Sequence, residues 1–219
     1  SKMPGSPVAY WVSTAFLTIF TSGLLKDVGT TRKGMFTGNN DLWLKFWQEI
    51  SFEKFGHQYK PYNKGGPYRK WYGNNDYVVN WGENGQAIKS FKGSGNINDA
   101  NNFLKCVTWS LITSGKPSFR LIDDTIHVMG DAGPISVFTD EVSLYYALAE
   151  LNSYIAEEAS YIINPTINCS SGTVSLFPLK IEKSRKLDVV NLSKHCVELC
   201  HTDWDSFENS WDFKKHPLV

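Results

Sequence analysis

The chain has 219 residues, 42% of them hydrophobic and 14% aromatic, and its 22 basic side chains balance its 22 acidic ones. These totals describe one globular domain, or one with a small appendage, and zero net charge argues against a histone-like nucleic-acid binder. The charge is nevertheless segregated, at +2 for residues 1–59, +6 for residues 60–120 and −8 for residues 121–219. Segregated charge of this kind is informative about the molecules that a protein binds, and not about its fold.

The sequence also excludes a membrane span and a disulfide scaffold. The longest apolar run, residues 8–25, is interrupted by serine, threonine and glycine, and it falls short of the ~20 apolar residues that a spanning helix needs. The first residues, 1–4, lack the layout of a secretory signal, and we interpret them as a cut end. Four scattered cysteines favour a reduced compartment, so we expect a cytoplasmic protein.

The first predicted element is a helix. An N-cap serine, a proline at the first helical position and an apolar stripe with helical spacing predict an amphipathic helix over residues 7–21. A glycine-rich basic loop follows at residues 30–40, and the aromatic run at residues 42–47 predicts a strand. Residues 77–81 and 86–89, on either side of a glycine-containing turn, have the pattern of a β-hairpin.

The remaining elements are short strands followed by helices. Strands are expected at residues 107–111, 119–122, 125–129 and 176–181. Apolar spacing predicts the strongest helix over residues 142–161 and a second helical stretch over residues 184–202. We therefore expect a β-rich α+β fold, with a main domain at residues 1–183 and a helical C-terminal extension at residues 184–219.

Candidate catalytic and metal motifs are weak. Residues 91–95 (FKGSG) resemble the F-x-G-x-G loop that methyltransferases place under their methyl donor, but they follow a polar arm, so a surface turn is expected. Residues 164–167 (NPTI) lack the second proline and the aromatic of the motif that holds a target amino group. Cys196 and Cys200, each beside a histidine, suit a helix core better than a zinc site. We expect no catalytic residue, cofactor or metal in this chain.

The clearest functional pattern is basic and aromatic. Residues 54–75 contain five lysines or arginines and no acid, and tyrosines and a tryptophan lie between them. Basic side chains neutralise phosphates and rings stack on bases, so this pattern favours nucleic-acid binding. Two alternatives stay open: a solvated basic loop with aromatics packed beneath it, and a carbohydrate platform.

A second candidate surface lies earlier in the chain. Arg32-Lys33-Gly34 and Thr37-Gly38-Asn39-Asn40 combine glycines with side chains that can pair with guanine and adenine edges. Taken by itself, this stretch is better explained as an ordinary turn between strands.

Eight stretches, in order over nearly the whole chain, resemble a family of large adenine-specific DNA methyltransferases. That family is PglX, of the BREX phage-defence type. The stretches are residues 4–11 (PGSPVAYW), 32–41 (RKGMFTGNND), 60–66 (KPYNKGG), 69–74 (RKWYGN), 78–81 (VVNW), 108–110 (TWS), 130–134 (GDAGP) and 203–213 (DWDSFENSWDF). Residues 144–153 and 176–179 are also similar to target-recognition domains of restriction-modification specificity subunits.

The resemblance implies a target-recognition domain that holds DNA in the major groove beside a separate catalytic domain. This chain lacks the catalytic Asn-Pro-Pro-Tyr motif and a methyl-donor loop in its proper context, so S-adenosylmethionine is expected only in the parent enzyme. The implied partners are double-stranded DNA, the catalytic domain of the parent methyltransferase and other defence-system proteins, with no membrane. The implied activity is sequence recognition for adenine-N6 methylation.

Fourteen residues are the candidates for DNA contact. Lys60, Lys64, Arg69 and Lys70 are expected at phosphates, and the six candidates for base or groove contacts are Arg32, Asn39, Asn40, Tyr62, Asn63 and Tyr72. The full set is Arg32, Lys33, Thr37, Asn39, Asn40, Lys60, Tyr62, Asn63, Lys64, Tyr68, Arg69, Lys70, Trp71 and Tyr72. The acidic C-terminal third is expected to face away from DNA. The alternative is a protein-interaction or carbohydrate-binding module that does not bind DNA.

Overall fold

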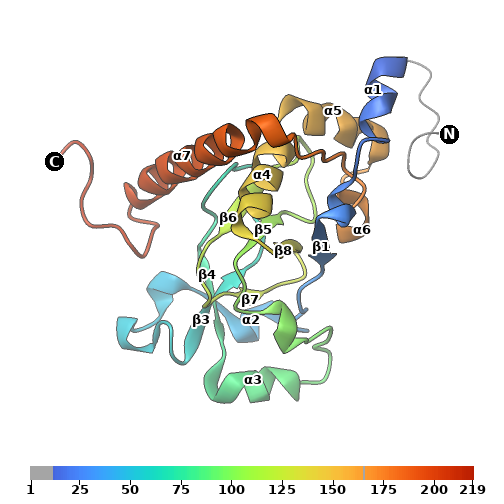
Figure 1. The fold of residues 1–219 in the computed structure, drawn as a ribbon. Helices are drawn as coiled ribbons and strands as arrows, with labels where there is room; N and C mark the ends of the chain where they lie inside the picture. Colours follow the sequence, from blue (N-terminus) through green and yellow to red (C-terminus); the bar gives the residue numbers. More distant parts are fainter. Residues whose placement is uncertain (1–11, 165) are drawn as a thin grey trace.

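Two four-stranded sheets and a set of helices make up the fold in the computed structural model, which describes residues 12–164 and 166–219 (Figure 1). Helices α1, α4, α5, α6 and α7 gather at one end of the molecule, and α2 and α3 lie at the other (Figure 1). The α+β class expected from the sequence is confirmed.

The first sheet carries the main core. It is wholly antiparallel, in the order β1 (Gly29–Arg32), β8 (Ile135–Phe138), β5 (Cys106–Trp109), β6 (Phe119–Ile122). Its strands are β-branched and aromatic, and β5 and β6 are buried along their whole length, as expected of strands covered on both faces. Trp109 and Phe119 pack there against Phe177 and Leu148.

Five helices accompany this sheet. They are α1 (Thr14–Ile19), α4 (Glu141–Leu151), α5 (Tyr154–Ile163), α6 (Ser171–Val174) and α7 (Lys186–Asp205). Helix α7 lies across α4 (Figure 1), and its Val190 and Val197 enter the main core. The division of the chain at residue 183 stays a prediction, but the C-terminal helix shares its core with the preceding residues.

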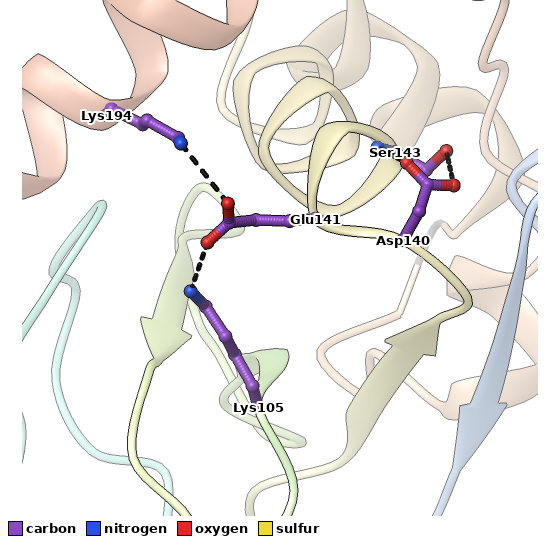
Figure 2. A network of polar contacts seen from close by, with 5 residues as sticks. All are labelled: Lys105, Asp140, Glu141, Ser143 and Lys194. Carbon is purple, nitrogen blue, oxygen red and sulfur yellow. Dashed lines mark hydrogen bonds and ion pairs between the residues drawn. The ribbon is translucent and has the colours of Figure 1, made fainter.

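A three-residue charge network also joins α7 to the sheet. Glu141, at the start of α4, accepts from Lys105 Nζ at 2.7 Å and from Lys194 Nζ of α7 at 3.3 Å (Figure 2). Both ammonium groups also lie near the Tyr145 ring, at 5.2 and 4.9 Å from its centroid. The residue before the helix, Asp140, caps it by accepting from the backbone N–H of Ser143 at 2.8 Å. Its other oxygen accepts from Ser143 Oγ at 2.7 Å (Figure 2).

The second sheet is mixed. Its order is β2 (Leu44–Phe46), β4 (Tyr77–Asn80), β3 (Tyr59–Asn63), β7 (Val128–Met129), with β3 and β7 parallel. Helices α2 (Asn40–Trp43) and α3 (Gly82–Lys89) accompany it, and Ile88 of α3 is buried with Val79 and Trp81. Short 3-10 turns lie at Leu25–Asp27, Trp47–Glu49, Phe52–Lys54, Asp99–Asn101 and Lys183–Arg185.

Asn63 ties the two sheets together. Its buried Nδ2 donates to Thr108 Oγ1 of β5 and to the Gly133 carbonyl, both at 2.8 Å. Gly130, which follows Met129 of β7, lies at the same junction between the sheets, because its N–H donates to the Asn63 carbonyl at 3.0 Å. This polar seam fixes how the loops of one sheet sit against the other.

Five expected elements differ in the structure, and strands β1, β3 and β8 were not expected. Of the strand expected at residues 125–129, only Val128–Met129 is extended. The hairpin at residues 77–89 is wrong, because residues 86–89 are helical instead of extended. Glu83, Asn84 and Gly85 have left-handed backbones (φ 51°, 55° and 73°) that form a kink within α3. The single helix at residues 142–161 is two helices, α4 and α5, because Asn152 ends the first with a non-helical backbone and Ser153 caps the second.

The expected strands at residues 42–47 and 176–181 also differ. Asn39 caps a helical turn through Trp43, so only Leu44–Phe46 is extended. Residues 176–181 form no strand, and only Pro178 makes an isolated bridge, to Leu24. The expected N-terminal helix is helical at Thr14–Ile19, and residues 7–11 of that prediction lie outside the described part. Across the described residues, every helix is too short or too polar to cross a membrane.

Candidate nucleic-acid interface

Two loops that are far apart in sequence meet beside the second sheet. We call residues 33–40 together with residues 91–96 the glycine junction. Phe36 and Gly95 exchange two backbone hydrogen bonds of 3.0 Å, and Asn96 Nδ2 donates to the carbonyls of Lys33 and Gly34 at 3.0 and 2.7 Å. The structure thus joins the second candidate surface to the turn at residues 91–95.

The close contact requires glycine. Gly38 has φ +74°, and a Cβ built on it would lie 2.5 Å from the carbonyl carbon of Gly93. A Cβ on Gly95 would lie 2.3 Å from the Phe36 ring. Real side chains do not approach backbone this closely, so only glycine allows the two loops to lie in contact. The turn expected at residues 91–95 is confirmed, since Ser94 N–H donates to the Phe91 carbonyl at 3.1 Å.

Asn39 and Asn40 are exposed at this junction, and the side-chain NH₂ group of each is free to donate. Asn39 Oδ1 caps α2 by accepting from Leu42 N–H at 3.1 Å, and Asn40 Oδ1 accepts from Thr37 Oγ1 at 2.6 Å. Each asparagine therefore uses its oxygen internally, while its NH₂ group makes no hydrogen bond within the described residues. Such a group can donate to a phosphate or to a base acceptor.

The junction also carries free cations. Lys33 and Lys92 are exposed, and neither forms an ion pair with any described residue. Asp99, in the 3-10 turn that follows the junction, pairs with Lys89 at 2.8 Å. Arg32 is less available, because its Nη1 donates to the Ala100 carbonyl at 2.9 Å. Lys92 and Asn96 are site residues that the sequence analysis did not select; the alternation of glycine with lysine at residues 91–95 was the available signal.

The basic segment at residues 54–75 uses its cations mainly within the fold. Lys70 Nζ donates to the Asn152 carbonyl at 2.7 Å, and Arg69 pairs with Asp203 at 3.6 Å beneath the Trp204 ring. Lys64 Nζ lies 4.0 Å from the Tyr77 ring centroid, and Lys60 Nζ donates to the Gly56 carbonyl. All four of the lysines and arginines expected at phosphates thus have partners in the protein.

The rings of that segment divide between core and surface. Tyr62 and Tyr72 are buried, as is the bridging Asn63, and Trp71 packs beside the main core. Burial raises the pKa of the Tyr62 phenol, with Asp131 adding to the effect. Tyr68 is 56% exposed, next to an open hollow of about 550 Å³ lined by Pro67, Ile112 and Lys116 among others. Buried side chains cannot reach a duplex from these positions, although they shape the loops that can.

The sequence analysis also missed a buried cation. Arg120 is 1% exposed, and its guanidinium donates to the Arg69 carbonyl at 3.3 Å and to Ser110 Oγ at 3.4 Å. No carboxylate of the described residues pairs with it, and burial, together with the Arg69 charge, lowers its pKa to about 10. Arg120 therefore adds positive potential beneath the loop that carries Arg69.

The described residues do not fit a methyl-donor site. The glycine loop at residues 91–95 follows helix α3 rather than a buried parallel strand, and it pairs with Phe36 instead of opening a helix. A methyl-donor loop of this kind belongs to a parallel βαβ unit, whereas the loop here follows β4 and α3, and β4 pairs antiparallel with both β2 and β3.

Among the described residues, the α+β fold thus presents a loop surface that is braced by glycines and carries unpaired cations and free amide groups. The whole chain is 37% identical, over 238 aligned residues, to the adenine-specific methyltransferase PglX of Lacticaseibacillus casei (strain Zhang). It is 34% identical, over 229 residues, to the adenine-specific methyltransferase BrxX of Escherichia coli O9:H4 (strain HS). The resemblance to the PglX family is therefore confirmed along the entire chain.

The chain spans about a fifth of the length of these relatives, with 20% of PglX and 18% of BrxX covered. No protein-family model matches it.

Proposed function

We propose that this chain recognises double-stranded DNA for an adenine-N6 DNA methyltransferase of the BREX type, in host modification and phage defence. Methyl transfer, and with it the binding of S-adenosylmethionine, takes place in a part of the parent enzyme outside this chain. The proposal is supported by the similarity to adenine-specific methyltransferases along the whole chain.

The observation that carries the proposal is the glycine junction. Lys33 and Lys92 are its unpaired cations, and Asn39 and Asn40 are its exposed amides with free NH₂ groups. Phosphate contacts from lysine position a protein on the duplex, while a free asparagine NH₂ group can donate to a base acceptor such as adenine N7. Because backbone contacts brace both loops, these groups lose little conformational freedom on binding.

In this proposal the candidates from residues 60–72 act in two ways. Lys64 and Tyr68 remain accessible enough to contact a phosphate or a base, whereas Tyr62, Asn63 and Tyr72 hold the loops in place. The partners are the duplex and the catalytic part of the parent enzyme, and the accompanying defence proteins are further expected partners.

Salt-dependent binding of the chain to duplex DNA tests the proposal. A fluorescent 30-base-pair duplex of mixed sequence is titrated at several NaCl concentrations, with a single strand and a glycan array as comparisons. Affinity should fall linearly on a log–log plot, because each lysine–phosphate contact releases about 0.9 of a counterion. Absence of duplex binding at 50 mM NaCl, or binding that salt does not weaken, would contradict the proposal.

A further inference from the structure

Two exposed apolar side chains from different loops meet at one hollow in the surface. Tyr68 belongs to the loop after β3, Ile112 belongs to the loop after β5, and each is 56% exposed. Both line the open hollow of about 550 Å³, together with residues 66–67 and 113–116. We call this feature the Tyr68 hollow. Because its ring and its branched aliphatic chain are left open to solvent, it offers apolar surface to a planar group.

Hydrogen bonds hold the walls of the Tyr68 hollow in place. The Gly66 carbonyl accepts from Ser110 Oγ at 2.7 Å, which joins the two loops directly. The Pro67 carbonyl accepts from Asn74 Nδ2 at 2.9 Å, which fixes the chain next to the aromatic ring. Walls that are held in the free protein lose little conformational freedom when a ligand binds, so the hollow is a preformed site.

The charge at the Tyr68 hollow is positive. Lys116 is its one charged lining residue among the described residues. Arg120 is buried behind the wall, where its guanidinium donates to Ser110 Oγ at 3.4 Å, and no described carboxylate pairs with it. Glu157 pairs with Lys116 at 2.6 Å, but the lysine side chain is 55% exposed, and ion pairs of exposed lysines are weak. An anionic ligand can therefore compete for Lys116.

The loop at residues 113–116 adds unused hydrogen-bond donors. The backbone N–H groups of Ser114 and Lys116 make no hydrogen bond within the described residues, and neither does Ser114 Oγ. Both residues are exposed. Backbone N–H groups, serine hydroxyls and lysine ammonium groups are the donors that proteins use to hold phosphate oxygens.

We propose that the Tyr68 hollow binds an unstacked nucleotide of DNA, with the base against Tyr68 and Ile112 and the phosphate at residues 114–116. The assignment rests on the proposed function, because it takes the ligand to be DNA. A base inside a paired duplex is stacked between its neighbours, so only a base that has left the stack can enter a concave site. The lining side chains include no carboxylate or amide to pair with sugar hydroxyls, which disfavours a carbohydrate.

This hollow and the glycine junction are built from different parts of the fold. The glycine junction lies beside the second sheet, whereas the Tyr68 hollow is joined to the end of β5 in the first sheet through Ser110. Paired DNA and an unpaired nucleotide should therefore respond to different substitutions. Stacking on an aromatic side chain tolerates every base, so the hollow adds a preference for DNA with an unpaired nucleotide and not for a particular sequence.

Fluorescence anisotropy with three probes tests the assignment. They are a paired 30-base-pair duplex, the same duplex with one bulged thymidine, and an oligothymidylate of about eight nucleotides. The wild type should prefer the bulged duplex over the paired one by at least about fivefold. Tyr68→Ala should remove this preference and weaken oligothymidylate binding by at least about fivefold, and Tyr68→Phe should retain both, because stacking needs the ring and not the hydroxyl.

Tyr154→Ala is the matched control. This tyrosine of α5 is 72% exposed and lies outside the lining of the hollow, so its removal should change binding of none of the three probes. Thermal melting of each variant shows whether it folds.

The outcomes separate this assignment from the proposed function. Binding of the paired duplex without a preference for the bulge, or with a preference that Tyr68→Ala keeps, overturns the hollow and leaves the proposed function standing. Oligothymidylate binding that depends on Tyr68, without binding of the paired duplex, supports the hollow and contradicts the proposed function. A polyglutamate peptide that binds more tightly than oligothymidylate of the same length would also overturn the assignment, because the ligand would then be an acidic peptide.

Discussion

Replacing Lys33 and Lys92 together by glutamine removes both free cations of the glycine junction while leaving its backbone contacts in place. Neither ammonium group makes an ion pair with a described residue, so the fold should keep its stability within about 0.5 kcal/mol. If each lysine neutralises one phosphate, the slope of log affinity against log salt should become less steep by about 1.8.

The loss of affinity follows from the same relation. One phosphate contact contributes a factor of about 15 at 50 mM salt and about 4 at 200 mM, relative to 1 M salt. Two lost contacts should therefore weaken duplex binding by about 200-fold at 50 mM and about 20-fold at 200 mM. Fluorescence anisotropy over four salt concentrations measures both the affinity and the slope.

The control is a second double variant with the same change in net charge. Lys26 and Lys180 are exposed on the opposite part of the fold, near β1 and the segment that leads into α7. Lys26→Gln with Lys180→Gln should leave the slope within about 0.3 of the wild type, because neither contacts the duplex. Equal losses in the two double variants would refute a localised interface and leave only a general effect of net charge.

Three further changes test how the fold supports this surface. Gly38→Ala should lower the free energy of unfolding by at least about 1 kcal/mol and weaken duplex binding, because the new Cβ meets Gly93 at 2.5 Å; Gly115→Ala, whose Cβ meets nothing within 4 Å, should change neither. Asn63→Ala should cost about 2–4 kcal/mol in urea unfolding by leaving buried groups unpaired, and a cost below 0.5 kcal/mol would contradict that role. Asp140→Ala should cost about 1 kcal/mol near neutral pH. Hydrogen bonds from Ser143 hold the Asp140 pKa below its usual range. The stabilisation by Asp140 is therefore complete above pH ~4 and is lost as the pH falls through the pKa of the folded state. If the difference in unfolding free energy between the wild type and Asp140→Ala does not shrink at pH 3, this explanation is contradicted.

Local sequence patterns predicted the secondary structure where the apolar residues of an element have a clear spacing. The apolarity of β5 and β6 gave strands close to those observed, and the apolar spacing of α7 gave its extent within a few residues, whereas β8 was not predicted. The hairpin at residues 77–89 failed because Glu83 and Asn84 adopt left-handed backbones, which local preference disfavours and which tertiary contacts of the Trp81 region must stabilise.

The candidate site was predictable only in part, for a related reason. The Gly34–Asn40 loop could be recognised from its glycines, cations and amides, but its partner at residues 91–96 lies more than fifty residues later in the chain. Whether a lysine is left without a partner in the protein also depends on contacts between residues that are far apart in the sequence. Lys70 and Lys33 are equally basic in sequence, yet only Lys70 is held by a distant carbonyl, that of Asn152.

The same reasoning resolves the segregated charge of the sequence. Three ion pairs join the basic middle of the chain to its acidic C-terminal third: Arg69 with Asp203, Lys105 with Glu141, and Lys116 with Glu157. Folding therefore cancels part of the +6 and −8 that the sequence keeps apart, and some of the acids lie beside the bases instead of facing away from them. The cations left unpaired matter most for DNA, which is why Lys33 and Lys92 provide a sharper test than the charge-rich segment at residues 54–75.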